Sequence, residues 1–256
     1  MTERVQGGGP VQGGGPIRDV AVRLVLRFFL GAYLRIRVDG AERLPPSAYI
    51  ACFNHPSWSD PLVLCAYWPD TSRRLSIFGP READMTVGAR NALITWTGRG
   101  VPFKPGGMDV LDVTRRATAI LRGGDIIVIA GEGRLSDREG EALPLQTGLG
   151  HFAQMAGVPV VPVAISGTRW LRFGKTIRVT IGEPIGLEGL ARGRRGAIEL
   201  TSRVQVALAA LLDAGGPHDE RVPGRFGTWL SEAFNERPWL DDAGADPTVA
   251  LPRSQG

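Results

Sequence analysis

The stretch Asn54-His55-Pro56-Ser57-Trp58-Ser59-Asp60-Pro61 separates two apolar segments, residues 48–53 and a segment that begins at Pro61. The first segment predicts a buried strand, and the second predicts a short helix that ends near Tyr67. Loops that follow a strand and precede a helix are where α/β folds place their ligand sites. This stretch is therefore our first candidate site, with Asp60 expected at the cap of the helix and Pro61 at its first position.

Outward from this loop, strand patterns and helix patterns alternate along the chain. Strands are predicted at 34–38, 48–53, 75–78, 125–130, 158–165 and 176–181, with a short extended piece at 101–103. Helices are predicted at 17–33, 61–67, 86–96, 108–121, 147–156, 187–212 and 226–235. Strands separated by helices indicate βα units. The expected fold is a single α/β domain with a mixed, largely parallel sheet flanked by helices, preceded by an amphipathic N-terminal helix.

The two ends of the chain differ in composition from its middle. Residues 5–16 read VQGGGP twice, and such a glycine-rich tract buries too little to offset the entropy of ordering it, so residues 1–16 are predicted to be disordered. Residues 17–215 form the predicted domain with its N-terminal helix, and residues 216–256 form a tail with one short helix. With 43% hydrophobic and 22% charged residues the chain can bury a core, which excludes wholesale disorder.

The formal net charge of +4 is unevenly distributed. Residues 216–256 carry four basic and seven acidic groups, so the excess of cations lies in the body of the chain. A basic body suits anionic partners such as a phosphorylated ligand or an anionic lipid. The arginines are scattered and match no nucleic-acid-binding motif, so no nucleic-acid partner is expected.

Several kinds of site are not expected. Cys52 and Cys65 lie in apolar segments, which is typical of reduced core residues. The three histidines have no metal-ligand spacing around them, so no metal site is expected. The sequence has neither a P-loop nor a G-x-S-x-G serine motif. The N-terminus lacks the pattern of a signal peptide, so the protein is expected to stay in the cytoplasm.

The predicted helix at 17–33 is amphipathic. Arg23 and Arg27 are four residues apart and therefore share one face. Two interpretations stay open: the helix lies in the interface of an anionic bilayer with its arginines at the headgroups, or it docks on the protein's own core. No stretch spans a membrane convincingly, because residues 28–34 are too few and residues 142–168 are interrupted by prolines and glycines.

His55 and Asp60 have the residue types of an acid–base pair. If the turn folds back, the Asp60 carboxylate can meet one ring nitrogen of His55, fix its tautomer and stabilise its protonated form. The other nitrogen is then able to take a proton from a substrate hydroxyl. The alternative is that Asp60 only caps the helix and His55 is a polar loop residue.

A second candidate segment, Gly131-Glu132-Gly133-Arg134-Leu135-Ser136, follows the predicted strand at 125–130. Its two glycines begin a dinucleotide-binding pattern, but Ser136 stands where the third glycine is needed, so that pattern is weak. Glu132 is interpreted as a site carboxylate at the end of a strand. The alternative is that Glu132 is a solvated turn residue.

These segments together resemble the glycerolipid acyltransferase family typified by bacterial 1-acylglycerol-3-phosphate acyltransferase. The family's first block, N-H-x4-D, is matched by Asn54, His55 and Asp60. Its third block, F-P-E-G-T-R-S, is matched in part by Glu132, Gly133 and Ser136. Its fourth block, an apolar strand with proline, is matched at residues 158–163, which include Pro162. The order and spacing agree over about residues 48–185.

The resemblance implies direct transfer of a fatty acyl group from acyl-CoA or acyl carrier protein to the hydroxyl of a lysophospholipid, without a cofactor. His55 is then the catalytic base and Asp60 its partner. The substrate-binding residues implied are Asn54, Lys104, Gly131, Glu132, Gly133, Arg134, Ser136 and Pro162. Backbone N–H groups near Gly131–Gly133 are our hypothesis for stabilising the tetrahedral oxyanion. A lipid substrate also favours membrane contact through the helix at 17–33, with the protein peripheral on the cytoplasmic face.

The family's two acceptor arginines are displaced in this sequence. Gly106 stands at the first position with Lys104 nearby, and Leu135 stands at the second with Arg134 one residue earlier. Both arginines are associated in the family with the phosphate of the acceptor, which a guanidinium binds in a bidentate way. The acceptor is therefore either lysophosphatidic acid-like or a lysolipid without a terminal phosphate. A thioester hydrolase and a non-catalytic membrane-binding module are the other functions left open.

Overall fold

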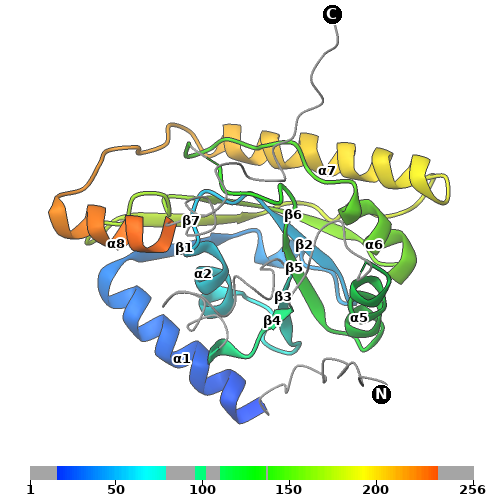
Figure 1. Cartoon of the computed structure of the whole chain (residues 1–256), viewed down its shortest axis with the longest axis horizontal. Helices are drawn as coiled ribbons and strands as arrows, with labels where there is room; N and C mark the ends of the chain where they lie inside the picture. The colour runs from blue at the N-terminus through cyan, green and yellow to red at the C-terminus, as the bar shows by residue number, and fades with distance from the viewer. Residues whose placement is uncertain (1–15, 79–95, 102–109, 137, 236–256) are drawn as a thin grey trace, which may run out of the picture.

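The computed structural model describes residues 16–78, 96–101, 110–136 and 138–235, and in it one sheet lies between two layers of helices (Figure 1). The predicted disordered tract lies outside these residues except for Pro16. Of the helix expected at 86–96 only Trp96 is described, and Lys104 lies outside the described residues as well.

The described strands form a single mixed sheet in the order β1-β7-β6-β2-β5-β3-β4. Neighbours from β6 to β4 are parallel, β7 is antiparallel to β6, and β1 is parallel to β7. This confirms the expected mixed, largely parallel sheet. The strands are β1 (Arg35–Asp39), β2 (Ile50–Phe53), β3 (Leu75–Phe78), β4 (Gly100–Val101), β5 (Ile126–Ala130), β6 (Val160–Ser166) and β7 (Thr176–Ile181).

The central strand β2 is buried on both faces, because helices cover both sides of the sheet. Ala51 and Phe53 belong to one core cluster, while Ile50 and Cys52 belong to the other. The alternation follows from the two-residue period of a strand. The core therefore has two halves, and β2 contributes side chains to each of them.

The helices divide between the two faces. The core cluster that contains Phe53 is covered by α1 and α2, and Leu230 of α8 packs against it. The other cluster is covered by α5, α6 and α7. The helices are α1 (Pro16–Tyr33), α2 (Asp60–Tyr67), α5 (Val110–Arg122), α6 (Gly148–Ala156), α7 (Arg194–Ala214) and α8 (Arg225–Asn235), with a 3-10 turn η1 (Ala41–Arg43).

Two expected helix starts are wrong. α7 begins at Arg194 and not near residue 187, because Gly189 and Gly193 have φ angles of +75° and +79°, which interrupt a right-handed helix. α2 begins at Asp60, so Ser59 occupies the cap position that we expected for Asp60. The Asp60 carboxylate instead bonds inside the preceding loop.

α1 docks on the protein through one row of residues. Val22 and Leu26 are buried in the core. Arg23 donates to the carbonyl of Trp68 at 2.5 Å, and the Arg27 guanidinium lies 4.9 Å from the centre of the Tyr67 ring. The cationic face therefore points at the end of α2, and the helix docks on the core, as one of the two open interpretations held. Among the described helices, none is both long enough and apolar enough to cross a bilayer.

Candidate active site

Three neighbouring parallel strands, β6, β2 and β5, end at the same edge of the sheet, and the loops that follow them form the candidate site. Asn54 follows β2 directly. Its buried side chain donates from Nδ2 to the Ile165 carbonyl at 2.9 Å, and its Oδ1 accepts from the Ile165 N–H at 2.7 Å. Because this amide pairs like a peptide group, it extends the β2–β6 ladder by one step. The geometry favours a supporting role for Asn54 and not the substrate contact that we predicted.

The structure brings His55 and Asp60 together. Nδ1 of His55 lies 2.9 Å from Oδ2 of Asp60, and the Ser57 N–H donates to the same oxygen at 2.9 Å. The Asp60 side chain is fully buried, whereas 14% of the His55 side chain is exposed. Among the described residues, no group hydrogen-bonds to Nε2 of His55. The pair therefore has the geometry of a base whose far nitrogen is open to a ligand.

The electrostatics of Asp60 depend on its burial. Burial raises the pKa of the Asp60 carboxyl, while His55, the nearby Thr168 hydroxyl and the Ser57 N–H oppose that rise. Neither Oδ1 of Asp60 nor Oγ1 of Thr168 reaches hydrogen-bond geometry with another described residue. A carboxylate held in this way is stabilised most when the adjacent imidazole is protonated.

Glu132, at the end of β5, is buried and not a solvated turn residue. One of its oxygens accepts from the His55 N–H at 3.1 Å and the other accepts from the Leu143 N–H at 2.8 Å. Burial raises the pKa of Glu132 to about 7, and these two hydrogen bonds limit the rise. Glu132 therefore lies at the candidate site, where its carboxyl binds the backbone of His55 and Leu143.

The rest of the β5 loop also supports His55. The Ser136 N–H donates to the His55 carbonyl at 2.9 Å, while its hydroxyl donates to the Arg138 carbonyl. The Gly133 N–H donates to the Ala130 carbonyl at 3.2 Å, so this group is already used and does not fit our oxyanion hypothesis. Gly133 and Arg134 are exposed.

Gly131 is required by close packing. A Cβ at this position would lie 2.5 Å from Sγ of Cys52 and 2.8 Å from Cδ2 of Leu145. Cys52 and Cys65 are free and buried, which confirms the prediction, and burial raises the pKa of Cys52 to about 12. Both thiols therefore belong to the core.

Pro162 does not join the cluster around His55. It lies inside β6 opposite Cys52, and a Cβ at Gly182 would meet its ring at 2.9 Å. The structure thus places Pro162 in the core beside Gly182. Lys104, the other predicted binding residue, lies outside the described ranges.

Sequence patterns did not reveal three other buried polar residues near the site: Glu139, Thr168 and Lys175. Glu139 accepts from the N–H groups of Gly167 and Arg169 and lies 3.8 Å from Nζ of Lys175. Burial raises the pKa of Glu139 and lowers that of Lys175. The partners come from loops about 30 residues apart, so only a signal for long-range contact could have revealed them.

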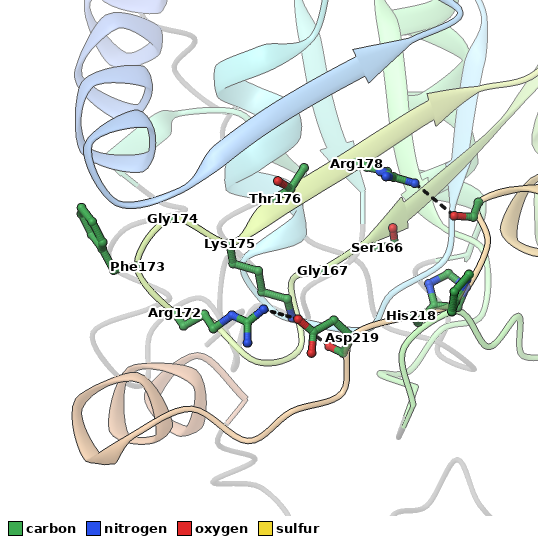
Figure 2. A pocket seen from close by; sticks show the side chains of 12 residues that line it. Ser166, Gly167, Arg172, Phe173, Gly174, Lys175, Thr176, Arg178, His218 and Asp219 are labelled. Atoms are coloured by element: carbon green, nitrogen blue, oxygen red, sulfur yellow. Dashed lines mark hydrogen bonds and ion pairs between the residues drawn. The ribbon is translucent and has the colours of Figure 1, made fainter.

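A polar hollow of about 400 Å³ lies beside this network, between the turn before β7 and the segment that follows α7 (Figure 2). Its cations have partners within the protein: Arg172 pairs with Asp219, Lys175 donates to the Asp219 carbonyl, and Arg178 donates to the Gly215 carbonyl. The hollow therefore marks where the start of the tail is tied to the body. Neither His55 nor Asp60 lines it.

Comparison with known proteins gives one family and one fold. The model of the Acyltransferase family matches residues 35–166, which is more than half of the chain. The structure resembles that of the 1-acyl-sn-glycerophosphate (LPA) acyltransferase PlsC from Thermotoga maritima, with a TM-score of 0.58 and 20% identity. The similarity covers 79% of this chain and 83% of that one. No curated protein matches the chain. The matched region contains His55, Asp60 and Glu132.

Proposed function

Because this chain belongs to the acyltransferase family, we propose that it moves a fatty acyl group from acyl-CoA or acyl carrier protein to the hydroxyl of a lysophospholipid in glycerolipid synthesis. The observation that carries the proposal is the pair formed by His55 and Asp60, with 2.9 Å between Nδ1 and Oδ2 and with Nε2 available to a ligand. The pair stands at the carboxyl edge of the sheet, where α/β folds bind their ligands.

In the proposed reaction, Nε2 of His55 takes the proton of the acceptor hydroxyl as that oxygen attacks the thioester carbonyl. The buried Asp60 carboxylate stabilises the imidazolium that forms. The tetrahedral intermediate then collapses, the C–S bond breaks, and the thiolate of the donor takes the proton back from His55. The products are an ester and a free thiol, so no acyl-enzyme and no cofactor is needed.

The acceptor headgroup is proposed to lie near Arg134. Leu135 stands at the position where the family has an arginine. Its apolar side chain is buried, with 8% exposed, and offers no donor to an anionic headgroup. Arg134 is exposed one residue earlier on the same loop. A lysophosphatidic acid-like acceptor would use this guanidinium, whereas the buried Leu135 favours a lysolipid without a terminal phosphate as the second candidate.

We also propose that the enzyme is peripheral on the cytoplasmic face of the membrane and that α1 contacts the bilayer. The row of α1 that faces away from the core is apolar: Ile17 is 86% exposed, Leu24 61% and Phe28 71%. Such a row on a docked helix suits insertion into a bilayer interface. It would bring a lipid substrate within reach of the protein.

The direct test is the release of thiol from palmitoyl-CoA by purified protein, with and without a panel of lysolipids. We expect release that depends on the acceptor and is lost in His55→Ala. The half-exposed His151 of α6 supplies a matched control, and His151→Ala should retain full turnover. Release that ignores the lysolipid would favour a thioester hydrolase. If no thiol is released, acyl carrier protein is the donor to test next, and inactivity there too would leave a non-catalytic membrane-binding module.

A further inference from the structure

An exposed aromatic surface joins the end of α1 to α8. We define it by Phe29, Tyr33, Phe173, Phe226 and Trp229. The exposed fractions are 67% for Phe29, 77% for Phe173 and 61% for both Phe226 and Trp229. Isolated exposed rings need no explanation, but a contiguous exposed patch marks an interaction site.

Four rings of this surface, those of Tyr33, Phe173, Phe226 and Trp229, are in contact. The ring of Tyr33 lies 6.0 Å from that of Phe173 and 6.1 Å from that of Phe226. The Phe226 ring lies 5.7 Å from Trp229. Phe29 stands one turn before Tyr33 on the same face of α1. Three segments far apart in the chain therefore build one continuous surface.

The orientation of α8 is fixed by its opposite face. The Ser231 hydroxyl accepts from the Leu171 N–H at 2.7 Å, and Leu230 packs on the core. A Cβ at Gly227 would come 2.5 Å from the Leu171 carbonyl oxygen, so the helix approaches this loop closely. Because α8 is docked by Gly227, Leu230 and Ser231, Phe226 and Trp229 are held outward.

Exposed arginines adjoin two rings of the aromatic surface along the chain. Arg35 follows Tyr33 by two residues, Arg225 directly precedes Phe226, and both arginines are exposed. The nearby acid Asp219 is already paired with Arg172 and Arg221. Rings of Trp, Tyr and Phe accompanied by exposed arginines match the interface of an anionic bilayer, where aromatic side chains sit at the level of the headgroups.

We infer that this aromatic surface binds an anionic membrane, so that α8 and the Phe173 turn are a second membrane contact beside α1. The inference rests on the proposed function in one respect, that a lipid-acylating enzyme works at a bilayer. It adds a role for the C-terminal part of the chain, which lies beyond the matched family region. Two contacts on one side of the sheet would fix the orientation of the enzyme, which a single helix cannot do.

The test is flotation of the full chain with vesicles of phosphatidylcholine and phosphatidylglycerol. We expect the triple variant Phe173→Ser/Phe226→Ser/Trp229→Ser to partition at least about tenfold less, which corresponds to about 1.4 kcal/mol. The matched control is Met155→Ser/Ile198→Ser/Val206→Ser, which replaces side chains 57%, 45% and 67% exposed on α6 and α7. This control should float like the wild type.

A second measurement separates loss of contact from loss of folding. Brominated lipid should quench the fluorescence of the wild type more than that of Trp229→Phe, which keeps an aromatic ring. The inference is overturned if the triple variant floats like the wild type, if the control loses as much, or if the wild type does not float. A dimer that dissociates in the triple variant, without a change in flotation, would overturn it in favour of self-association. Flotation is measured without acyl donor or lysolipid and therefore does not depend on turnover. Wild-type protein that floats but transfers no acyl group in the activity assay would overturn the proposed function and leave the membrane contact standing.

Discussion

The loop after β2 and the loop after β5 meet at one edge of the sheet and serve the site differently. The β2 loop places its reactive side chains toward each other, with His55 and Asp60 in contact. The β5 loop turns its carboxylate inward, where Glu132 binds the backbone of His55 and Leu143, and leaves Arg134 exposed. In the proposed reaction, the β2 loop supplies the base and its partner, and the β5 loop holds the backbone of the β2 loop in place. Substitutions of the reactive side chains in the β2 loop should therefore lower kcat, whereas substitutions of the buried β5 carboxylate should change stability.

The largest expected effect comes from Asp60→Asn, which keeps the shape of the side chain and removes its charge. Without the carboxylate the imidazolium of His55 loses its stabilisation, and we expect kcat to fall about 10²- to 10⁴-fold. Because burial raises the pKa of Asp60, removing this charge should not lower the free energy of unfolding greatly. Stopped assays of thiol release and a denaturant titration measure the two quantities.

Asp70→Asn is the matched control, because Asp70 caps the turn at Ser72 beyond the end of α2. Because Asp70 pairs with Ser72 and Arg73 and not with His55, the kcat of this variant should stay within about twofold of the wild-type value. Equal losses of kcat in both variants would mean that Asp60 has no specific part in the reaction.

Asn54→Ala should lower the free energy of unfolding. It leaves the N–H and the carbonyl of Ile165 without their side-chain partner in a buried place, which costs about 1 to 3 kcal/mol for each group. We expect the free energy of unfolding to fall by about 3 to 4 kcal/mol. Thr201→Ala removes a buried hydroxyl that bonds one turn back to the Ala197 carbonyl, and it should lose about 1 kcal/mol. Similar losses in chemical denaturation would refute the bridging role of Asn54.

The sequence predicted the β2 loop well because its signals are local. The continuous apolar run of β2 and the five-residue spacing of His55 and Asp60 lie within one strand and one turn. The same holds for most strands and helices, whose period is visible in the chain. The start of α7 was missed because its apolar pattern continues through Gly189 and Gly193, which interrupt the helix.

The β5 loop could be placed from sequence but not interpreted. The burial of Glu132 depends on partners 11 and 77 residues away, and that of Glu139 on partners about 30 residues away. Likewise, the spacing of Arg23 and Arg27 predicted that they share a face. The hydrogen bond from Arg23 to the distant Trp68 carbonyl shows that this face points toward the protein. Contacts between distant segments leave no periodic pattern in a single sequence.

Glu132→Gln should change how stability depends on pH. Since folding raises the pKa of Glu132 from 4.5 to about 7, the folded state binds the extra proton more tightly than the unfolded state between these values. The contribution of this carboxyl is therefore complete below pH 4.5 and is lost as the pH rises through about 7. Relative to Glu132→Gln, the wild type should lose about 3 kcal/mol of unfolding free energy over this range.

Denaturant titrations of the wild type and of Glu132→Gln at several pH values give the difference between their unfolding free energies. Titrating groups that both proteins share contribute equally to the two values and cancel in this difference. Glu141→Gln, on the same loop but half-exposed, is the control and should give a difference that is flat with pH. A flat difference for Glu132→Gln as well would show that Glu132 is not desolvated by folding.

The smallest effect is expected from Arg134→Ala, which tests the outward side of the β5 loop. Arg134 is exposed, and within the described ranges no hydrogen bond or ion pair joins it to His55 or Asp60, so kcat should stay near the wild-type value. If Arg134 binds the acceptor phosphate, KM for lysophosphatidic acid should rise about 3- to 10-fold, as the loss of an exposed charge pair allows. KM for the acyl donor should not change. Arg138→Ala, an exposed arginine four residues further on, is the control and should leave both constants unchanged. A KM for lysophosphatidic acid that does not respond to Arg134→Ala would favour an acceptor without a terminal phosphate, because the buried Leu135 offers no replacement for the missing cation.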